Sequence, residues 1–188
     1  MEDKDIKTRI KEVAVDHFNK NGYHGTTIRK IASDVGCSLP MIYYYYKNKK
    51  ELFHEIIKKD YFEILREQAN KLKAVNIIDF YTDFVYGLND LSSYDKKIYR
   101  LGVKVYLSFD GDDELMEIMD DWEKSITDRH SKLVLPHLKD QEKGEVIVRT
   151  LIHLLENLIE SIAVKNRFIA REEIYEELLI ILGDRIKN

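Results

Sequence analysis

The sequence is poor in residues that form turns and cross-links. Its 188 residues include two prolines, eight glycines and one cysteine. So few turn-forming residues argue against an all-β sandwich and favour long helices. The single cysteine, Cys37, cannot form a disulfide within the chain, and a reducing cytoplasm is the simplest compartment for such a protein.

Long apolar runs are also absent. The longest aliphatic run, Leu178 to Leu182, is far shorter than the roughly 20 residues that a membrane helix needs. The opening residues MEDKDIKTR contain no apolar segment of the kind found in secretory signals. Hydrophobic residues make up 44% and charged residues 34%, a balance that argues against disorder. We expect a cytoplasmic protein without a membrane partner.

Signatures of catalysis and metal binding are missing as well. No GxSxG, GxGxxG or Walker loop occurs, and no CxxC or HExxH. The acidic run Asp110–Glu114 resembles a calcium loop only superficially, because Leu115 occupies the position of the obligatory glycine. We therefore expect no enzymatic activity, no cofactor and no metal.

The net charge of −4 hides an asymmetry between the two ends of the chain. Residues 1–50 contain ten Lys and Arg against six Asp and Glu, whereas residues 51–188 contain twenty against twenty-eight. A basic N-terminal segment on an acidic body indicates a local anionic partner.

Apolar periodicity predicts an all-α fold. Three helices are expected first, over Asp5–Asn21, Ile28–Val35 and Leu39 to about Tyr46. Only Gly36-Cys37-Ser38 separates the second from the third, a spacing typical of a helix-turn-helix unit. A long helix should follow Asn48 and run to about Leu72. Further helices are expected near 76–92, 94–109, 113–135, 141–166 and 171–186.

The last two expected helices carry a broad apolar stripe. Its width exceeds what one small core requires and indicates a helix pair that packs against another subunit. The residues assigned to this homodimer interface are Leu151, Leu155, Leu158, Ile159, Ile162, Leu178, Ile181 and Leu182.

The third expected helix has an unusual outer face. A helical wheel places Pro40, Met41, Tyr44 and Tyr45 opposite the apolar side, with Tyr43 on the flank. Exposed aromatic and apolar groups are expected where something docks. In a DNA major groove they would contact thymine methyl groups, while tyrosine hydroxyls would reach phosphate oxygens.

These residues carry a family resemblance. The segments Thr26-Thr27-Ile28-Arg29-Lys30-Ile31-Ala32 and Met41-Ile42-Tyr43-Tyr44-Tyr45-Tyr46-Lys47-Asn48-Lys49-Lys50-Glu51-Leu52 resemble the N-terminal domain of the tetracycline-repressor (TetR) family. The resemblance covers about residues 5–55. It implies a DNA-binding domain at 1–60, a helical ligand-binding and dimerisation domain at 61–188, and a homodimer. The DNA contacts that it implies, together with our own assignments, are Thr27, Arg29, Ser38, Leu39, Pro40, Met41, Tyr43, Tyr44, Tyr45, Lys47 and Lys49.

Two positions depart from the family pattern. Many relatives have a polar residue where this chain has Leu39 and a small one where it has Pro40. Both are apolar here, so base recognition would depend on methyl and shape contacts.

The resemblance also implies a cavity for a small-molecule effector. Candidate ligand contacts are Phe84, Tyr106, Phe109, Trp122, His153, Glu156 and Asn157. Aromatic residues inside helices are more often core, and polar groups on a buried helix face find either a ligand or a neighbouring helix as partner. An aromatic lining favours a lipophilic or flat ligand.

The sequence therefore predicts a sequence-specific transcriptional regulator, a repressor released from a palindromic operator by a small lipophilic or aromatic molecule. Two alternatives come from other classes. One is a helical enzyme, for which no catalytic residues are found. The other is a helix-bundle adaptor that binds a protein through its tyrosines, whose binding would depend less on salt than DNA binding does.

Overall fold

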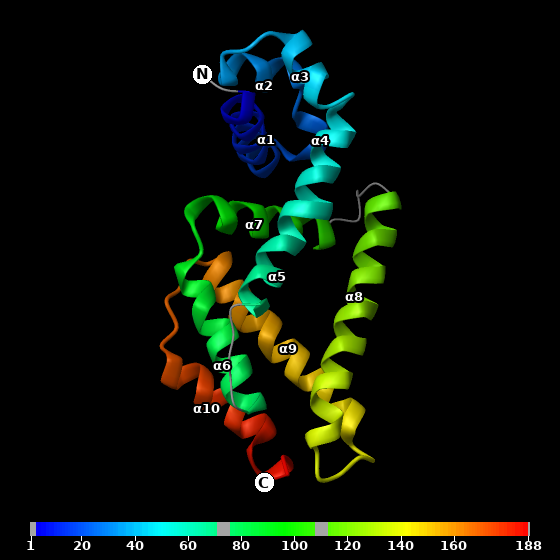
Figure 1. Ribbon diagram of the computed structural model, residues 1–188, viewed down its shortest axis with the longest axis vertical. Coiled ribbons are helices and arrows are strands. Elements are labelled where there is room, and N and C mark those ends of the chain that lie inside the picture. The colour runs from blue at the N-terminus through cyan, green and yellow to red at the C-terminus, as the bar shows by residue number, and fades with distance from the viewer. Residues whose placement is uncertain (1–2, 71–75, 108–112, 188) are drawn as a thin grey trace. The chain divides into compact units, whose positions relative to one another are not determined.

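The computed structural model describes residues 3–70, 76–107 and 113–187, which are almost entirely helical (Figure 1). The all-α class is confirmed, with one isolated antiparallel bridge, between Leu138 and Ile186, in the described residues. Within these residues, no helix has the length and apolar character needed to cross a membrane.

The N-terminal helices follow the expected order. They are α1 (Asp3–Gly25), α2 (Ile28–Val35), α3 (Leu39–Tyr45), α4 (Lys49–Glu55), a π-helical stretch (Ile56–Tyr61) and α5 (Phe62–Asn70). The later helices are α6 (Ile77–Gly87), α7 (Ser93–Leu107), α8 (Asp113–Val134), α9 (Gly144–Ala163) and α10 (Arg171–Leu182). Short 3-10 turns occupy Leu88–Asp90, Leu135–His137 and Gly183–Arg185.

The chain forms two compact units. The first contains Met1–Leu65 and Ser92–Gly111, so α7 belongs with the helix-turn-helix unit despite its distance in sequence. The side chain of Asn19 on α1 donates to the carbonyl oxygen of Lys97 on α7 at 2.9 Å. Lys104 of α7 donates in return to the carbonyl oxygen of Asn19 at 2.6 Å. Helices α1 and α7 are thus joined by hydrogen bonds as well as by apolar packing.

A close approach of α7 to the π-helical stretch adds to the first unit. A Cβ atom at Gly102 of α7 would lie 2.5 Å from the ring of Tyr61. Only glycine admits this ring, because any side chain would overlap it.

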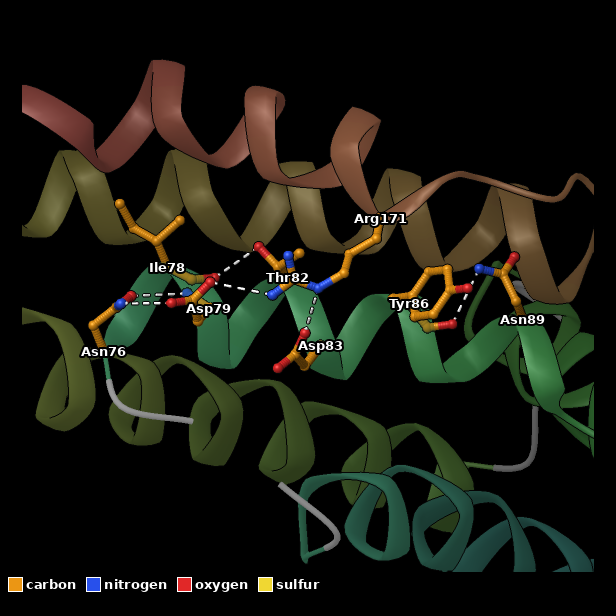
Figure 2. Close-up of polar contacts among 8 residues, drawn as sticks. All are labelled: Asn76, Ile78, Asp79, Thr82, Asp83, Tyr86, Asn89 and Arg171. Carbon is orange, nitrogen blue, oxygen red and sulfur yellow. Dashed lines mark hydrogen bonds and ion pairs between the residues drawn. The ribbon is translucent and has the colours of Figure 1, made fainter. Parts of the chain in front are cut away.

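The second unit contains Arg66–Leu91 and Asp112–Asn188. Within it, α6 packs against α10, and α9 packs against both α8 and α10. Figure 2 shows the polar contacts of α6, where Nε of Arg171 donates to Asp83 at 2.8 Å and its NH2 group donates to Asp79 at 3.2 Å. Asn89 forms two hydrogen bonds with the backbone of Ile169, at 2.9 and 3.2 Å. The Arg171 contacts attach the start of α10 to α6. The Asn89 contacts attach the segment before α10 to the 3-10 turn that follows α6.

The core of the second unit corrects the sequence-based interpretation of the apolar stripe. Leu151, Leu155, Leu158, Ile159, Ile162, Leu178 and Leu182 are all buried within the chain itself, and only Ile181 of the assigned set is partly exposed. A single chain already covers these side chains because α6 and α8 pack onto α9 and α10. Two apolar side chains of these helices remain in solvent, Val146 on α9, which is 55% exposed, and Ile180 on α10, which is 75% exposed.

Candidate nucleic-acid interface

Helix α2 has defined ends and two distinct faces. The hydroxyl of Thr27 accepts a hydrogen bond from the backbone N–H of Lys30 at 3.3 Å and so caps the start of the helix. Gly36, with φ of 74°, ends it in a left-handed conformation that glycine adopts without strain. The apolar face is buried, whereas Thr27 and Arg29 are exposed.

Helix α3 is fixed by its inner face and exposes its tyrosines. The hydroxyl of Ser38 accepts from the N–H of Met41 at 3.4 Å. Ile42 and Tyr46 are fully buried, and these two residues anchor the helix. Tyr43 is 53% and Tyr44 76% exposed on the outer face. The helix therefore presents phenol groups to a partner without losing its own packing.

Asn48 and Glu51 define where α4 begins. The side-chain oxygen of Asn48 accepts from the N–H of Glu51 at 2.8 Å, and a carboxylate oxygen of Glu51 accepts from the N–H of Lys47 at 2.6 Å. The two hydrogen bonds cap the start of α4 and fix the direction in which the chain leaves α3.

All eleven residues assigned to DNA contacts lie on α2, α3 and their flanking segments, and none is buried. Those that are exposed are Thr27, Arg29, Ser38, Pro40, Tyr43, Tyr44 and Lys47; those that are partly exposed are Leu39, Met41, Tyr45 and Lys49. Their role in binding DNA remains a prediction.

The ammonium group of Lys49 is held by hydrogen bonds within the chain. Its Nζ atom donates to the carbonyl oxygens of Tyr23 at 2.7 Å and Thr26 at 2.9 Å. It also lies 4.2 Å from the centre of the Tyr23 ring. Burial lowers the pKa of this ammonium group. Sequence reasoning missed these contacts because they join positions more than twenty residues apart.

The structure describes the side chains of four of the seven residues assigned to an effector pocket. Phe84 is partly buried, whereas His153, Glu156 and Asn157 are exposed. Phe109 lies outside the described residues, as do the side chains of Tyr106 and Trp122. An open hollow on α8 has a polar lining that includes Asp120, Lys124 and Thr127, and it contains none of the assigned residues. The assignment therefore stays a prediction.

A buried polar pair in the second unit was not foreseen. The hydroxyl of Tyr81 on α6 lies 2.6 Å from Nδ1 of His130 on α8. Neither residue occurs in a recognisable motif. The pair could therefore not be predicted from the sequence and is seen only in the folded unit. Among the described residues, no cluster of His, Cys, Asp and Glu is arranged to hold a metal ion.

Comparison with known proteins agrees with this geometry. Residues 10–56, which span α2 and α3, match the sequence model of a family described as bacterial regulatory proteins, tetR family. Over 89 residues the chain is 26% identical to the biofilm operon icaADBC HTH-type negative transcriptional regulator IcaR of Staphylococcus epidermidis. That alignment covers 45% of this chain and 48% of IcaR, so the chain spans about half the length of this relative.

Solved structures extend the likeness to the whole fold. A TetR-like transcriptional regulator from Rhodococcus sp. RHA1 superposes with a TM-score of 0.72 at 17% identity, covering 94% of this chain and 92% of that one. A structure described as a SmeT–triclosan complex superposes with a TM-score of 0.70 at 16% identity, covering 97% and 92%. At these identities the superpositions establish a shared fold.

Proposed function

Because the chain belongs to the tetR family of bacterial regulatory proteins, we propose that it is a DNA-binding transcriptional regulator that acts as a repressor. The observation that carries this proposal is the exposure of Tyr43 and Tyr44 on a helix whose opposite face is fully buried. A protein of this size gains nothing in stability from tyrosines that remain in water, so their exposure favours a docking role.

The surroundings of this helix suit a DNA backbone. The N-terminus of α2 carries the positive end of a helix dipole, with Thr27 and Arg29 exposed beside it. Lys47 is exposed just beyond α3. Contacts to phosphates would fix the position of the protein, while α3 would read base edges and thymine methyl groups in the major groove.

Two further elements complete the proposal. A homodimer formed through the outer faces of α9 and α10 would bury exposed Val146 and Ile180 and would place two α3 helices on a palindromic operator. A small lipophilic or aromatic molecule would bind the second unit preferentially in a conformation unsuited to DNA and so release the repressor. A fold shared with a SmeT–triclosan complex supports an effector of this kind.

Salt dependence tests the proposal against the adaptor alternative. A duplex recovered from a random-sequence selection is labelled, and its dissociation constant is measured by fluorescence anisotropy over a range of salt concentrations. For a repressor, log affinity should fall linearly with log salt, with a slope of about −0.9 per neutralised phosphate. Absence of any affinity for duplex DNA, in protein refolded to remove bound ligand, would contradict the proposal.

A further inference from the structure

The helix that follows Asn48 changes its hydrogen-bonding register between Ile56 and Tyr61. These six residues form the π-helical stretch that separates α4 from α5. π-Helical turns are rare, and they occur mostly as single turns within α-helices, often at functional sites. Neither glycine nor proline occurs between Lys49 and Asn70, so no local helix breaker accounts for the change. We therefore look for its cause in contacts with other helices.

Two ion pairs join this part of the chain to α1. Nζ of Lys7 lies 3.1 Å from a carboxylate oxygen of Glu55, the last residue of α4. Nζ of Lys11 lies 3.0 and 2.8 Å from the two carboxylate oxygens of Asp60. The second pair is well shielded from water, since its side chains are 21% and 16% exposed. The two lysines are four residues apart and share one face of α1, whereas the two carboxylates are five residues apart.

The π register lets both carboxylates face α1. In an α-helix five residues advance by about 500°, so Glu55 and Asp60 would lie about 140° apart around the helix axis. In a π-helix the hydrogen bonds join residues five apart, and such residues become neighbours as residues four apart are in an α-helix. An α register would therefore break one of the two pairs, and loss of the Lys11 pair would leave a shielded carboxylate without its partner.

Helix α7 holds the same register by packing. Tyr61, the last residue of the π-helical stretch, is largely buried, and its ring occupies the space left by the missing side chain of Gly102. A change of register by one residue would turn Tyr61 by about 100° and withdraw the ring from this space. The ion pairs with α1 and the ring on α7 thus select one register together.

The register is linked to the proposed DNA-contacting helix through Lys7. The ammonium group of Lys7, which pairs with Glu55, also lies 5.5 Å from the centre of the Tyr46 ring. Tyr46 is the fully buried residue that ends α3. A shift that withdrew Glu55 from Lys7 would therefore change the packing around the anchor of α3. Beyond the π-helical stretch, the same register sets the rotation of α5, which begins in the first unit and ends in the second.

We propose that the stretch Ile56–Tyr61 is a register switch. In the π register the ion pairs with α1 hold α3 ready for the operator, and in an α register, which lacks one of those pairs, operator binding is weakened. This inference rests on the proposed function and deepens it. An effector that turned α5 within the second unit would release the operator by favouring the α register.

Deletion of Lys59 provides the test, because it shortens the spacing between Glu55 and Asp60 from five residues to four. An ordinary α-helix then directs both carboxylates toward α1, and no second register competes. Lys59 is exposed, and Lys59→Ala is the matched control, since it removes the same charge and keeps the spacing. Both variants should bind the operator as tightly as the wild type. A folded deletion variant that binds no operator would overturn the switch.

Loss of the Lys11 pair should weaken operator binding only where the switch is intact. We expect Lys11→Met and Asp60→Asn each to lose on the order of tenfold in affinity, in the wild type and in Lys59→Ala, because part of the molecules adopts the α register. Neither change should weaken binding in the deletion variant. Asp60→Asn removes a negative charge, so a purely electrostatic effect on DNA binding would have the opposite sign.

Three results would contradict this expectation. They are equal losses of affinity with and without the deletion, tighter binding by Asp60→Asn, and wild-type affinity in Lys11→Met. Each would show that the Lys11 pair does not act through the register of Ile56–Tyr61.

The NMR signal of Gly102 provides the test if the deletion variant does not fold. In protein labelled with nitrogen-15 glycine, the ring current of Tyr61 should displace the proton signals of Gly102 in the π register. Lys11→Met and Asp60→Asn should move these signals toward their undisplaced positions in proportion to the affinity that each variant loses. Unmoved signals together with a loss of affinity would overturn the inference. A wild-type protein that binds no duplex would contradict the proposed function instead, and the two failures are therefore distinguishable.

Discussion

The phenol of Tyr81 and the imidazole of His130 form a largely buried hydrogen bond of 2.6 Å between α6 and α8. Burial, with a smaller contribution from the nearby charge of Arg129, lowers the pKa of His130 to about 4. The imidazole is therefore neutral at pH 7. With its proton assigned to Nε2, Nδ1 accepts from the Tyr81 hydroxyl, whose own pKa is raised by burial.

The lowered pKa of His130 predicts a loss of stability in acid. Above pH 6.5 the imidazole is neutral in both the folded and unfolded states, and it adds no pH dependence. As the pH falls from 6.5 to about 4, the unfolded state takes up the proton first and the folded state loses stability. The full loss is about 3 kcal/mol. Denaturant unfolding at several pH values measures it, and His130→Gln should flatten this part of the profile.

An exposed histidine supplies the control for this prediction. His137 is exposed in the same unit, and His137→Gln measures the effect of the same substitution away from the Tyr81 pair. Subtracting the unfolding free energy of His130→Gln from that of the wild type removes the carboxylate effects that both proteins share. A difference that stays constant between pH 6.5 and 4 would count against a buried neutral imidazole.

Gly102→Ala should destabilise the first unit by overpacking. The added methyl group would lie 2.5 Å from the Tyr61 ring, and the ring is largely buried and cannot move aside freely. We expect a loss of roughly 1–3 kcal/mol in unfolding free energy. Gly87→Ala is the control, because its added methyl group meets only the flexible end of Gln68 at 3.2 Å. Equal stability of the two variants would show that α7 does not pack on Tyr61 as described.

Arg171 should contribute modestly to the attachment of α10 to α6. Its guanidinium group bridges Asp79 and Asp83 but is 40% exposed, so solvent screens the ion pairs. A double-mutant cycle of Arg171→Met and Asp83→Asn should give a coupling of about 0.2–1 kcal/mol in unfolding free energy. The coupling should shrink in high salt. A coupling of zero at low salt would contradict the pairing seen in Figure 2.

Tyr43→Ala should weaken operator binding on the order of tenfold, equivalent to about 1.4 kcal/mol. Its side chain is 53% exposed, so the melting temperature should be almost unchanged. Tyr86→Ala on α6, which is 37% exposed in the second unit, is the matched control and should bind like the wild type. Unaltered affinity in Tyr43→Ala would remove this residue from the proposed interface.

Ile180→Glu should dissociate the proposed dimer. Ile180 is 75% exposed on α10, so a charge there costs the single chain little but would be buried without a partner in a dimer. Sedimentation equilibrium should show a monomer for this variant and a dimer for the wild type. The exposed Glu176 on the same helix offers a control, because Glu176→Gln changes a charge without adding one to an apolar surface.

The helix-turn-helix elements could be read from sequence because their signals are local. Thr27, Gly36 and Ser38 act within three or four residues, so α2 has the predicted bounds and α3 differs by one residue at its end. The break expected after Asn21 is also present, because Gly22 has a non-helical φ of 69°, and a second short helical segment continues from there to Gly25.

Contacts between distant segments could not be read in this way. An apolar stripe shows that Leu151 and Leu178 are buried, but it does not show whether the same chain or another buries them. The charge of Lys49 indicated a phosphate partner, because nothing local reveals that two carbonyl oxygens more than twenty positions earlier converge on its ammonium group. The docking of α7 on α1 could not be predicted for the same reason, because Asn19 and Lys97 are far apart in the sequence and meet only in the folded unit.

Sequence-specific binding is tested most directly by a selection of random DNA duplexes with the 188-residue protein, freed of ligand by unfolding and refolding. One palindromic sequence should be enriched. Its half-sites should be separated by about one helical turn of roughly 10 base pairs, or by a multiple of it. The same selection with Tyr43→Ala should enrich that sequence less strongly. A wild-type selection that yields no enriched sequence at low salt would contradict the claim that this chain is a sequence-specific DNA-binding repressor.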